Sequence, residues 1–174
     1  MAGSQRQWLR KAIKRHLLPA FEQRGFSIVP LSDAELSDRE NRSTFPFGRL
    51  RRANSRAFEV VEIQLAPYGD PALRLNVGVV PNEGYTFSWG HAAAEDFPVT
   101  GLQDFYVLYP SPRTRRWFKV RRWPWTKVIE ADYDTLVKGI VDLIPEVEQI
   151  FNDGTSGPHV RHTRMPWTTS TAKN

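Results

Sequence analysis

The feature that most constrains the fold is a pair of strand-like segments on either side of a compact turn. Residues 57–65 are rich in Val and Ile, and residues 73–80 carry an apolar side chain at every second position. Between them, residues 67–71 read Pro-Tyr-Gly-Asp-Pro, which is typical of a turn. The pattern predicts an antiparallel hairpin with one apolar face. Other elements of the chain must cover that face, because an alternating strand buries only one side.

Two amphipathic helices can provide the cover. Gln5–Arg24 and Asp132–Phe151 each carry apolar residues at helical spacing along one face. Pro19 is expected to kink or divide the first helix and Pro145 to interrupt the second, because proline removes a backbone donor. Gly25 is expected to end the first helix, since a positive φ costs glycine little. The order predicts a two-layer α+β fold: an antiparallel sheet with an N-terminal and a C-terminal helix packed on one face.

The segments between these elements are assigned from composition. Residues 45–52, 105–109 and 115–123 are expected to add strands, and the polar stretch 32–43 is expected to form a mobile loop. The resulting domain spans residues 1–153.

The end of the chain has a different composition. Residues 154–174 are rich in Gly, Ser, Thr and Pro, which is typical of a segment that forms no packed core. We therefore expect a mobile C-terminal tail over residues 154–174, with little contribution to stability.

Composition and charge exclude several classes of protein. The chain has no cysteine, which excludes a disulfide scaffold, a thiolate zinc site and a Cys nucleophile. Lys and Arg number 24 against 19 Asp and Glu, so the net charge is +5. The segment 5–26 carries too many charges to span a bilayer, and no apolar run follows a basic start as in a signal peptide. These features predict a cytoplasmic protein with no membrane partner.

No recognisable catalytic or metal-binding motif is present. A glycine-rich phosphate loop, Gly-x-Ser-x-Gly and His-Glu-x-x-His are all absent. His91 and Glu95 would share one face of a helix, but two ligands are too few for a typical metal site, and an exposed turn is the simpler interpretation. We therefore expect no catalytic residue, no cofactor and no metal. A binding protein is favoured, and the alternative is an enzyme whose site the sequence does not reveal.

One segment is unusual, the basic and aromatic stretch 113–125. In a strand over 115–123, alternate side chains would form a cationic and aromatic stripe, because successive side chains point to opposite faces. The polar residues at 74 and 76 point away from the apolar face of their own strand and would extend this stripe. The candidate partner-binding residues are Arg74, Asn76, Trp117, Lys119, Arg121 and Trp123.

Two kinds of partner fit such a stripe. Phosphate contacts combined with base stacking suit single-stranded nucleic acid. Arg and Trp are also favoured anchors for an acidic protein partner. The simpler interpretation is a solvated sheet face on which Arg side chains cover Trp rings. The sequence thus predicts a non-enzymatic binding protein and leaves these alternatives open.

The order of elements also resembles a known family. The segments that carry the resemblance are Leu18-Pro19 followed by Gly25-Phe26, residues 60–64, residues 73–79 and the Trp-containing segment before the acidic final helix. Across residues 8–152 the chain is similar to the bacterial family of unknown function numbered 4304. The resemblance implies a bacterial domain of helix, strands and helix, and it assigns no catalytic residue. The chain departs from that pattern in the arginine-rich stretch 49–56, which is not expected there, and in the tail, which has no counterpart.

Overall fold

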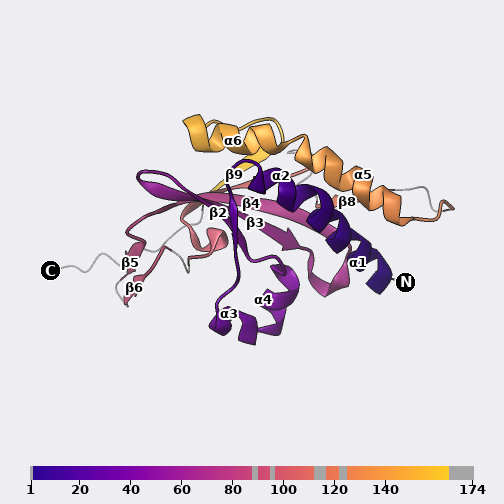
Figure 1. Ribbon diagram of the computed structural model, residues 1–174, viewed down its shortest axis with the longest axis horizontal. Helices are drawn as coiled ribbons and strands as arrows, with labels where there is room; N and C mark the ends of the chain where they lie inside the picture. Colours follow the sequence, from indigo (N-terminus) through magenta and orange to yellow (C-terminus); the bar gives the residue numbers. More distant parts are fainter. Residues whose placement is uncertain (1, 88–89, 95–96, 112–116, 122–124, 165–174) are drawn as a thin grey trace.

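An antiparallel sheet forms the centre of the molecule (Figure 1). The computed structural model describes residues 2–87, 90–94, 97–111, 117–121 and 125–164. In this part of the chain the main sheet has the strand order β1-β2-β3-β4-β7-β9, and β8 pairs with β4. The strands are β1 Ser27–Val29, β2 Arg49–Ala53, β3 Ala57–Leu65, β4 Ala72–Pro81, β7 Asp104–Leu108, β8 Phe118–Lys119 and β9 Val160–Arg164. A separate hairpin, β5 Tyr85–Phe87 and β6 Gly90–Ala92, projects at one end.

The predicted hairpin is confirmed as β3 and β4. Their register runs from Ala57 opposite Pro81 to Leu65 opposite Leu73. A short 3-10 turn, Pro67–Gly69, joins them, and Tyr68 adopts a positive φ of 58° there. Pairing over the whole length of both strands makes this hairpin the frame on which the other elements are placed.

The N-terminal helix is continuous but contains a widened turn. It consists of α1 Ala2–Ala12, a π-helical turn Ile13–Leu17 and α2 Leu18–Glu22. Pro19 has no N–H to donate to the carbonyl of Arg15, and the π turn lies directly before it. Gly25 follows with φ 84°, as expected after a helix end.

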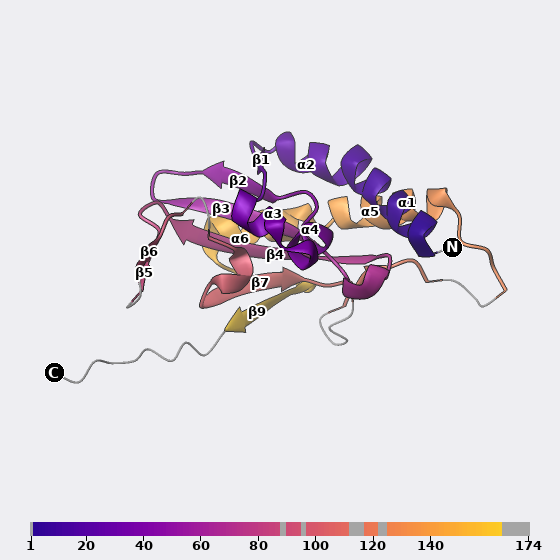
Figure 2. The same ribbon diagram turned by 90° about the horizontal axis from the view of Figure 1, so that it is seen from below.

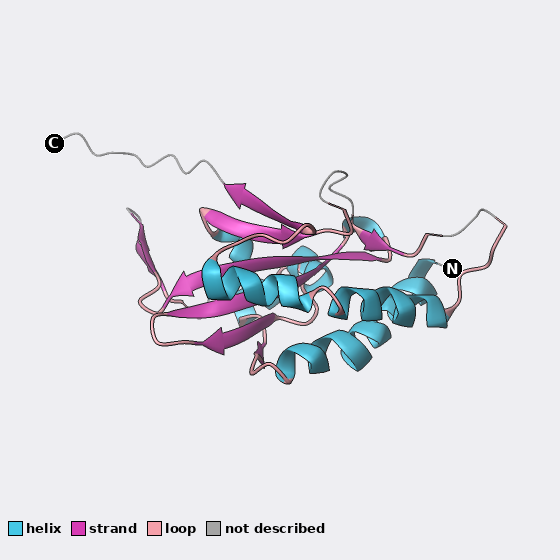
Figure 3. Ribbon diagram, turned by 90° about the horizontal axis from the view of Figure 1, so that it is seen from above, coloured by secondary structure: helices cyan, strands magenta, loops and turns pink. Residues whose placement is uncertain are grey.

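The C-terminal helix is divided into α5 Glu130–Val141 and α6 Ile144–Asp153. Pro145 lies in the first turn of α6, where its missing N–H costs nothing. Both helical segments lie on the same face of the sheet as α1 and α2 (Figures 1 and 3). The α+β class and the shared helix-bearing face are therefore confirmed. The core on this face includes Leu9, Ile13, Leu17, Phe21, Val61, Ile63, Leu75, Val77, Tyr133, Val137 and Ile140.

The second face of the sheet is also covered, contrary to the expectation of an open face. A second apolar cluster joins Val60 and Val107 of the sheet to Phe97, Val99 and Leu102 of the following loop. This loop includes a 3-10 turn at Val99–Gly101. It packs on the second face because one end of that face carries apolar side chains, namely Val60 of β3, Val80 of β4 and Phe105 and Val107 of β7.

Two further expectations were wrong. The polar stretch 32–43 is not a loop but contains two short helices, α3 Asp33–Ser37 and α4 Arg39–Thr44, which lie on the second face (Figure 1). Ser32 and Glu35 form a capping box at the start of α3, so the polar residues that indicated a loop are helix caps.

The predicted tail over 154–174 is also wrong for residues 160–164, which form β9 at the edge of the sheet beside β7 (Figure 2). Val160 is buried against the helix-bearing face, which explains why this polar segment pairs with the domain. The predicted strand over 115–123 is present as β8 at Phe118–Lys119, and its remaining positions fall partly outside the described residues.

Candidate ligand-binding groove

The residues predicted to bind a partner do not form one open surface. Asn76 is completely buried, and its Nδ2 donates to Gln64 Oε1 over 3.0 Å. The expectation that Asn76 is accessible is therefore wrong, because α3, α4 and the loop with Val99 cover the face on which it lies.

The rest of the predicted stripe lies at one end of the sheet. The Arg74 guanidinium lies over the Trp117 ring, 4.7 Å from its centroid, while its Nε donates to Gln64 Oε1 over 2.7 Å. Lys119 and Arg121 are exposed, and Trp123 lies outside the described residues. The structure thus brings Arg74 and Trp117 together as an Arg–aromatic pair, flanked by two exposed cations.

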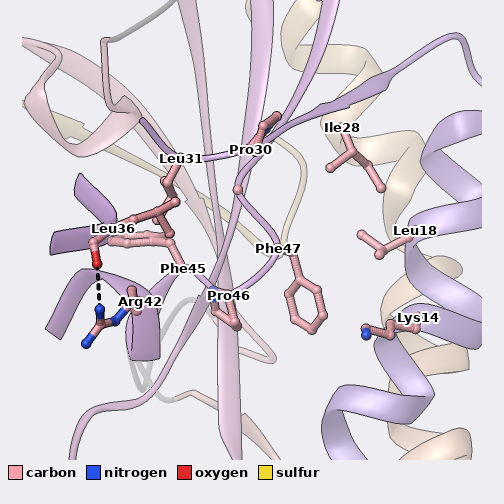
Figure 4. A pocket seen from close by; sticks show the side chains of 11 residues that line it. Lys14, Leu18, Ile28, Pro30, Leu31, Leu36, Arg42, Phe45, Pro46 and Phe47 are labelled. Carbon is pink, nitrogen blue, oxygen red and sulfur yellow. Dashed lines mark hydrogen bonds between the residues drawn. The ribbon is translucent and has the colours of Figure 1, made fainter. Parts of the chain in front are cut away.

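A pocket separate from the predicted stripe lies between the N-terminal helix and the segment that enters β2 (Figure 4). Its volume is about 450 Å³. A second hollow of about 280 Å³ adjoins it and shares Lys14, Pro46 and Phe47. Together they form a groove, hereafter the helix groove, that follows one side of the helix from Gln7 to Leu18.

The floor of the helix groove is apolar. The helix contributes Leu18, and Phe47 lies opposite it (Figure 4). Ile28 and Leu36 are exposed by 41% and 39%, so two aliphatic side chains of the groove face solvent. The other apolar lining residues are Pro30, Leu31, Phe45 and Pro46. Aliphatic and aromatic surface exposed in a concave site is typical of a ligand-binding groove.

A glycine, Gly48, permits the close approach of the segment before β2 to the end of β1 beneath this floor. Gly48 has φ 67°, and a Cβ atom there would lie 2.2 Å from the carbonyl oxygen of Val29. Any side chain at this position would therefore push β2 away from the end of β1. The groove depends on this contact, because Phe47 precedes Gly48 and Pro30 follows Val29.

The rim of the helix groove carries charge of one sign. Arg10, Lys11 and Lys14 project from the helix, and Arg42 projects from α4 on the other side. Among the residues that the structure describes, no acidic one lines either hollow. The Nε of Arg10 is buried and has no hydrogen-bond partner among the described residues. The groove therefore combines an apolar floor with a basic edge, in which Lys11 pairs with Glu130 of α5 over 3.5 Å.

Polar contacts hold the outer wall of the groove. Arg42 donates to the carbonyl of Leu36 over 2.8 Å, which joins α4 to α3 (Figure 4). Glu35 of α3 accepts hydrogen bonds from both terminal nitrogens of Arg49 on β2. Burial acts to raise the pKa of Glu35, but hydrogen bonds from Arg49 and Ser32 lower it below its usual value. An ionised Glu35 therefore anchors the wall to the sheet.

Sequence reasoning missed the helix groove. Its lining comes from residues 7–48, and the wall formed by α3 lies in the stretch interpreted as a loop. The available signal was Ser32-x-x-Glu35, which is a capping box. The groove itself depends on how the helix crosses β1 and β2, which no local pattern specifies.

The described residues contain no cluster of three or more His, Cys, Asp or Glu side chains that could hold a metal ion. His16 pairs with Asp134 over 2.8 Å between the two helices, so this histidine bridges packed elements. No helix in the described part of the chain combines the length and apolar character needed to cross a bilayer.

Comparison with known proteins identifies no relative from which a function could be transferred. Searches against protein-family models, curated proteins and solved structures return no match to this chain. The resemblance to family 4304 therefore stays a prediction, and the functional argument rests on the geometry of the chain.

Proposed function

We propose that the protein binds an acidic polypeptide partner, and that the helix groove holds an amphipathic segment of that partner. Apolar side chains of the segment would lie against Leu18, Ile28 and Phe47, and its carboxylates would pair with the rim. The observation that carries the proposal is the lining itself, whose described residues include four basic and no acidic side chains above an apolar floor.

The spacing of the rim charges favours a chain over a small anion. Arg10, Lys11 and Lys14 follow the helix, whereas Arg42 lies across the groove. A fatty acid or a free phosphate presents one anionic group, which could reach only part of this rim. A peptide carries several carboxylates along its length, and charge complementarity of this kind raises association rate and specificity.

Single-stranded nucleic acid at the predicted stripe is the second candidate. The contact between Arg74 and Trp117 and the exposure of Lys119 and Arg121 favour it. Aromatic rings beside cations are typical of surfaces on which bases of single strands stack. The two candidates use separate residues, so variants can distinguish them.

Fluorescence anisotropy tests both candidates with matched charge reversals. The groove variant is Lys14→Glu with Arg42→Glu, and the stripe variant is Lys119→Glu with Arg121→Glu, which makes the same change in net charge. The probes are a labelled acidic peptide containing Leu and Phe, the same peptide with Ser in place of its apolar residues, and a labelled oligothymidylate.

The proposal expects the groove variant to weaken peptide binding by about 10-fold or more, corresponding to two lost charge-assisted contacts. The Ser-substituted peptide should bind more weakly than the parent peptide, since it leaves the apolar floor unused. The stripe variant should retain peptide binding. Loss of oligothymidylate binding in the stripe variant alone, with a steep salt dependence, would instead support the nucleic-acid candidate. If neither probe bound the wild-type protein, both candidates would be wrong.

A further inference from the structure

A buried carboxyl group lies behind the wall of the helix groove. Glu62 occupies the middle of β3 on the second face, and its side chain is 3% exposed. Its Oε1 accepts two hydrogen bonds, one from Arg49 Nε over 3.0 Å and one from the backbone N–H of Val99 over 3.1 Å. Its Oε2 is equally buried but has no hydrogen-bond partner among the described residues.

A second unpaired acceptor lies on the adjacent strand. Asn76 is directly opposite Glu62 in the pairing of β3 with β4. The amide nitrogen of Asn76 donates to Gln64, and its Oδ1 is buried without a donor. Side chains directly opposite each other on one face of an antiparallel pair lie close together. Two buried acceptors at such positions are costly unless a hydrogen atom satisfies both.

The charges around Arg49 do not balance if both of its carboxylates are ionised. Its terminal nitrogens donate hydrogen bonds to Glu35, and its Nε donates one to Glu62. One guanidinium between two carboxylates leaves one negative charge, and the Arg49 side chain is only 4% exposed. An unbalanced charge in such a site is strongly unfavourable. Removing the charge of one carboxylate restores neutrality.

Glu62 is the carboxyl group that can be neutral. Glu35 is 23% exposed and accepts two hydrogen bonds from Arg49, so its ionised form is supported. Glu62 is almost wholly enclosed and has one oxygen to spare. We propose that Glu62 carries a proton in the native protein at neutral pH and donates it from Oε2 to Asn76 Oδ1.

The surroundings of Glu62 are consistent with this assignment. The charged groups that face it are Arg49 from β2 and Glu35 beyond it from α3. From β4 it faces the neutral Asn76, and from the loop it faces the N–H of Val99. Burial raises the pKa of Glu62, against the opposing charge and hydrogen bond of Arg49.

The proton on Glu62 should also affect peptide binding in the helix groove. This part of the inference rests on the proposed function. A neutral Glu62 leaves the charge of Arg49 to Glu35, whose helix α3 carries the groove residue Leu36. An ionised Glu62 would compete for Arg49 and loosen that anchor. Peptide affinity should therefore fall as the pH rises through the pKa of Glu62 in the folded protein, and Glu62→Gln should remove that dependence.

The test replaces the carboxylic acid with an amide that can donate the same hydrogen bond. Glu62→Gln is compared with Glu59→Gln, a matched control on the same strand. Glu59 is also buried beside an arginine of β2, but both of its oxygens accept hydrogen bonds, from Arg52 and Asn54. The readouts are urea unfolding over a range of pH and the infrared C=O band of a protonated carboxylic acid.

The sign of the pH effect follows from the raised pKa. Wild-type stability from Glu62 is fully present below the unfolded pKa and is lost as the pH rises toward the folded pKa. Glutamine does not titrate, so Glu62→Gln should equal the wild type in acid and exceed it increasingly toward alkaline pH. The carboxylic acid band should disappear in this variant, whereas Glu59→Gln should leave it and lower stability at neutral pH.

Two results would overturn the assignment. One is a loss of stability in Glu62→Gln at neutral pH as large as that in Glu59→Gln. The other is a wild-type spectrum without a protonated carboxylic acid band at neutral pH. Neither readout involves a peptide, so failure of the acidic-partner proposal would leave this result standing. A pH-independent peptide affinity in a protein with the expected infrared band would reject only the link to the groove.

Discussion

Two arginines of β2 each lie between two glutamates, on opposite faces of the same pair of strands. Arg49 contacts Glu62 and Glu35 on the second face, and this group is hereafter the inner triad. The outer triad places Arg52 between Glu59 of β3 and Glu148 of α6 on the helix-bearing face. The charge count is the same in both. Solvent access differs, since the Arg52 side chain is 24% exposed and that of Arg49 is 4% exposed.

The difference shows how solvent changes the chemistry of one arrangement. In the outer triad, Arg52 also donates to the carbonyl of Arg24 and lies 4.5 Å from the centroid of the Phe26 ring, and Glu148 is 22% exposed. An extra negative charge there is stabilised by hydration. In the inner triad Arg49 and Glu62 are almost fully enclosed, and the proton proposed for Glu62 would remove the charge that hydration cannot stabilise there. The same local sequence pattern therefore gives a partly exposed ion-pair network on one face and, on our proposal, a proton site on the other.

Removal of Arg49 should have the largest effect. Arg49→Met leaves Glu62 without its side-chain donor and detaches Glu35 and its helix from the sheet. We expect a loss of about 3–5 kcal/mol in the free energy of unfolding, the range for breaking a buried ion pair on one side. Urea unfolding at neutral pH measures it. If Arg49→Met lowered the free energy of unfolding by less than Arg52→Met does, the inner triad would not be the more costly one to break.

A double-mutant cycle between Glu35 and Glu62 should have the next largest effect. With Glu35 present, Glu62→Gln is expected to keep or raise stability at neutral pH. In a Glu35→Gln background, Glu62 becomes the remaining carboxylate of Arg49 and should ionise, so Glu62→Gln then costs stability. We expect a coupling of about 1–3 kcal/mol, as for residues in one network. Additive effects of the two changes would mean that the carboxylates do not share the arginine.

Removal of Arg52 should cost less than removal of Arg49. Arg52→Met loses a partly hydrated network and a cation–π contact but keeps an apolar stem against Phe26. We expect a loss of about 1–2 kcal/mol in the free energy of unfolding. Calorimetry of both Arg→Met variants in one buffer gives the comparison. Equal melting temperatures for the two variants would contradict the role given to solvent.

The smallest effect is expected at the exposed end of the outer triad. Glu148→Gln removes one carboxylate from Arg52, which keeps Glu59 as its partner. We expect a loss of about 0.5 kcal/mol at low salt that shrinks as salt is added, because partly exposed pairs are screened. The effects of Glu35→Gln and Arg49→Met should respond less to salt. A salt-insensitive Glu148→Gln would show that this pair is more enclosed than its exposed fraction indicates.

Local patterns were sufficient for the frame of the molecule. The hairpin of β3 and β4, the two helices and their shared face follow from periodicity, and Pro19 and Pro145 lie where the helix geometry changes. These features succeed because a period of two or of 3.6 residues is a property of a short segment. The edge strand β9 was not predicted because it pairs with β7 through a long-range contact, and its polar sequence lacks the apolar alternation that indicates a strand.

The candidate sites depended on contacts between distant segments. Sequence alone identified a basic stretch at 49–56 and a basic helix, but not which of their charges are neutralised. The register that sets Arg49 opposite Glu62 and Arg52 opposite Glu59 assigns them to separate faces. The tertiary structure then covers one face with α3, α4 and the Val99 loop, and leaves Lys14 and Arg42 facing the groove. Burial and solvation depend on these long-range contacts, so only the folded chain distinguishes the enclosed Arg49, the partly exposed Arg52 and the basic rim of the helix groove.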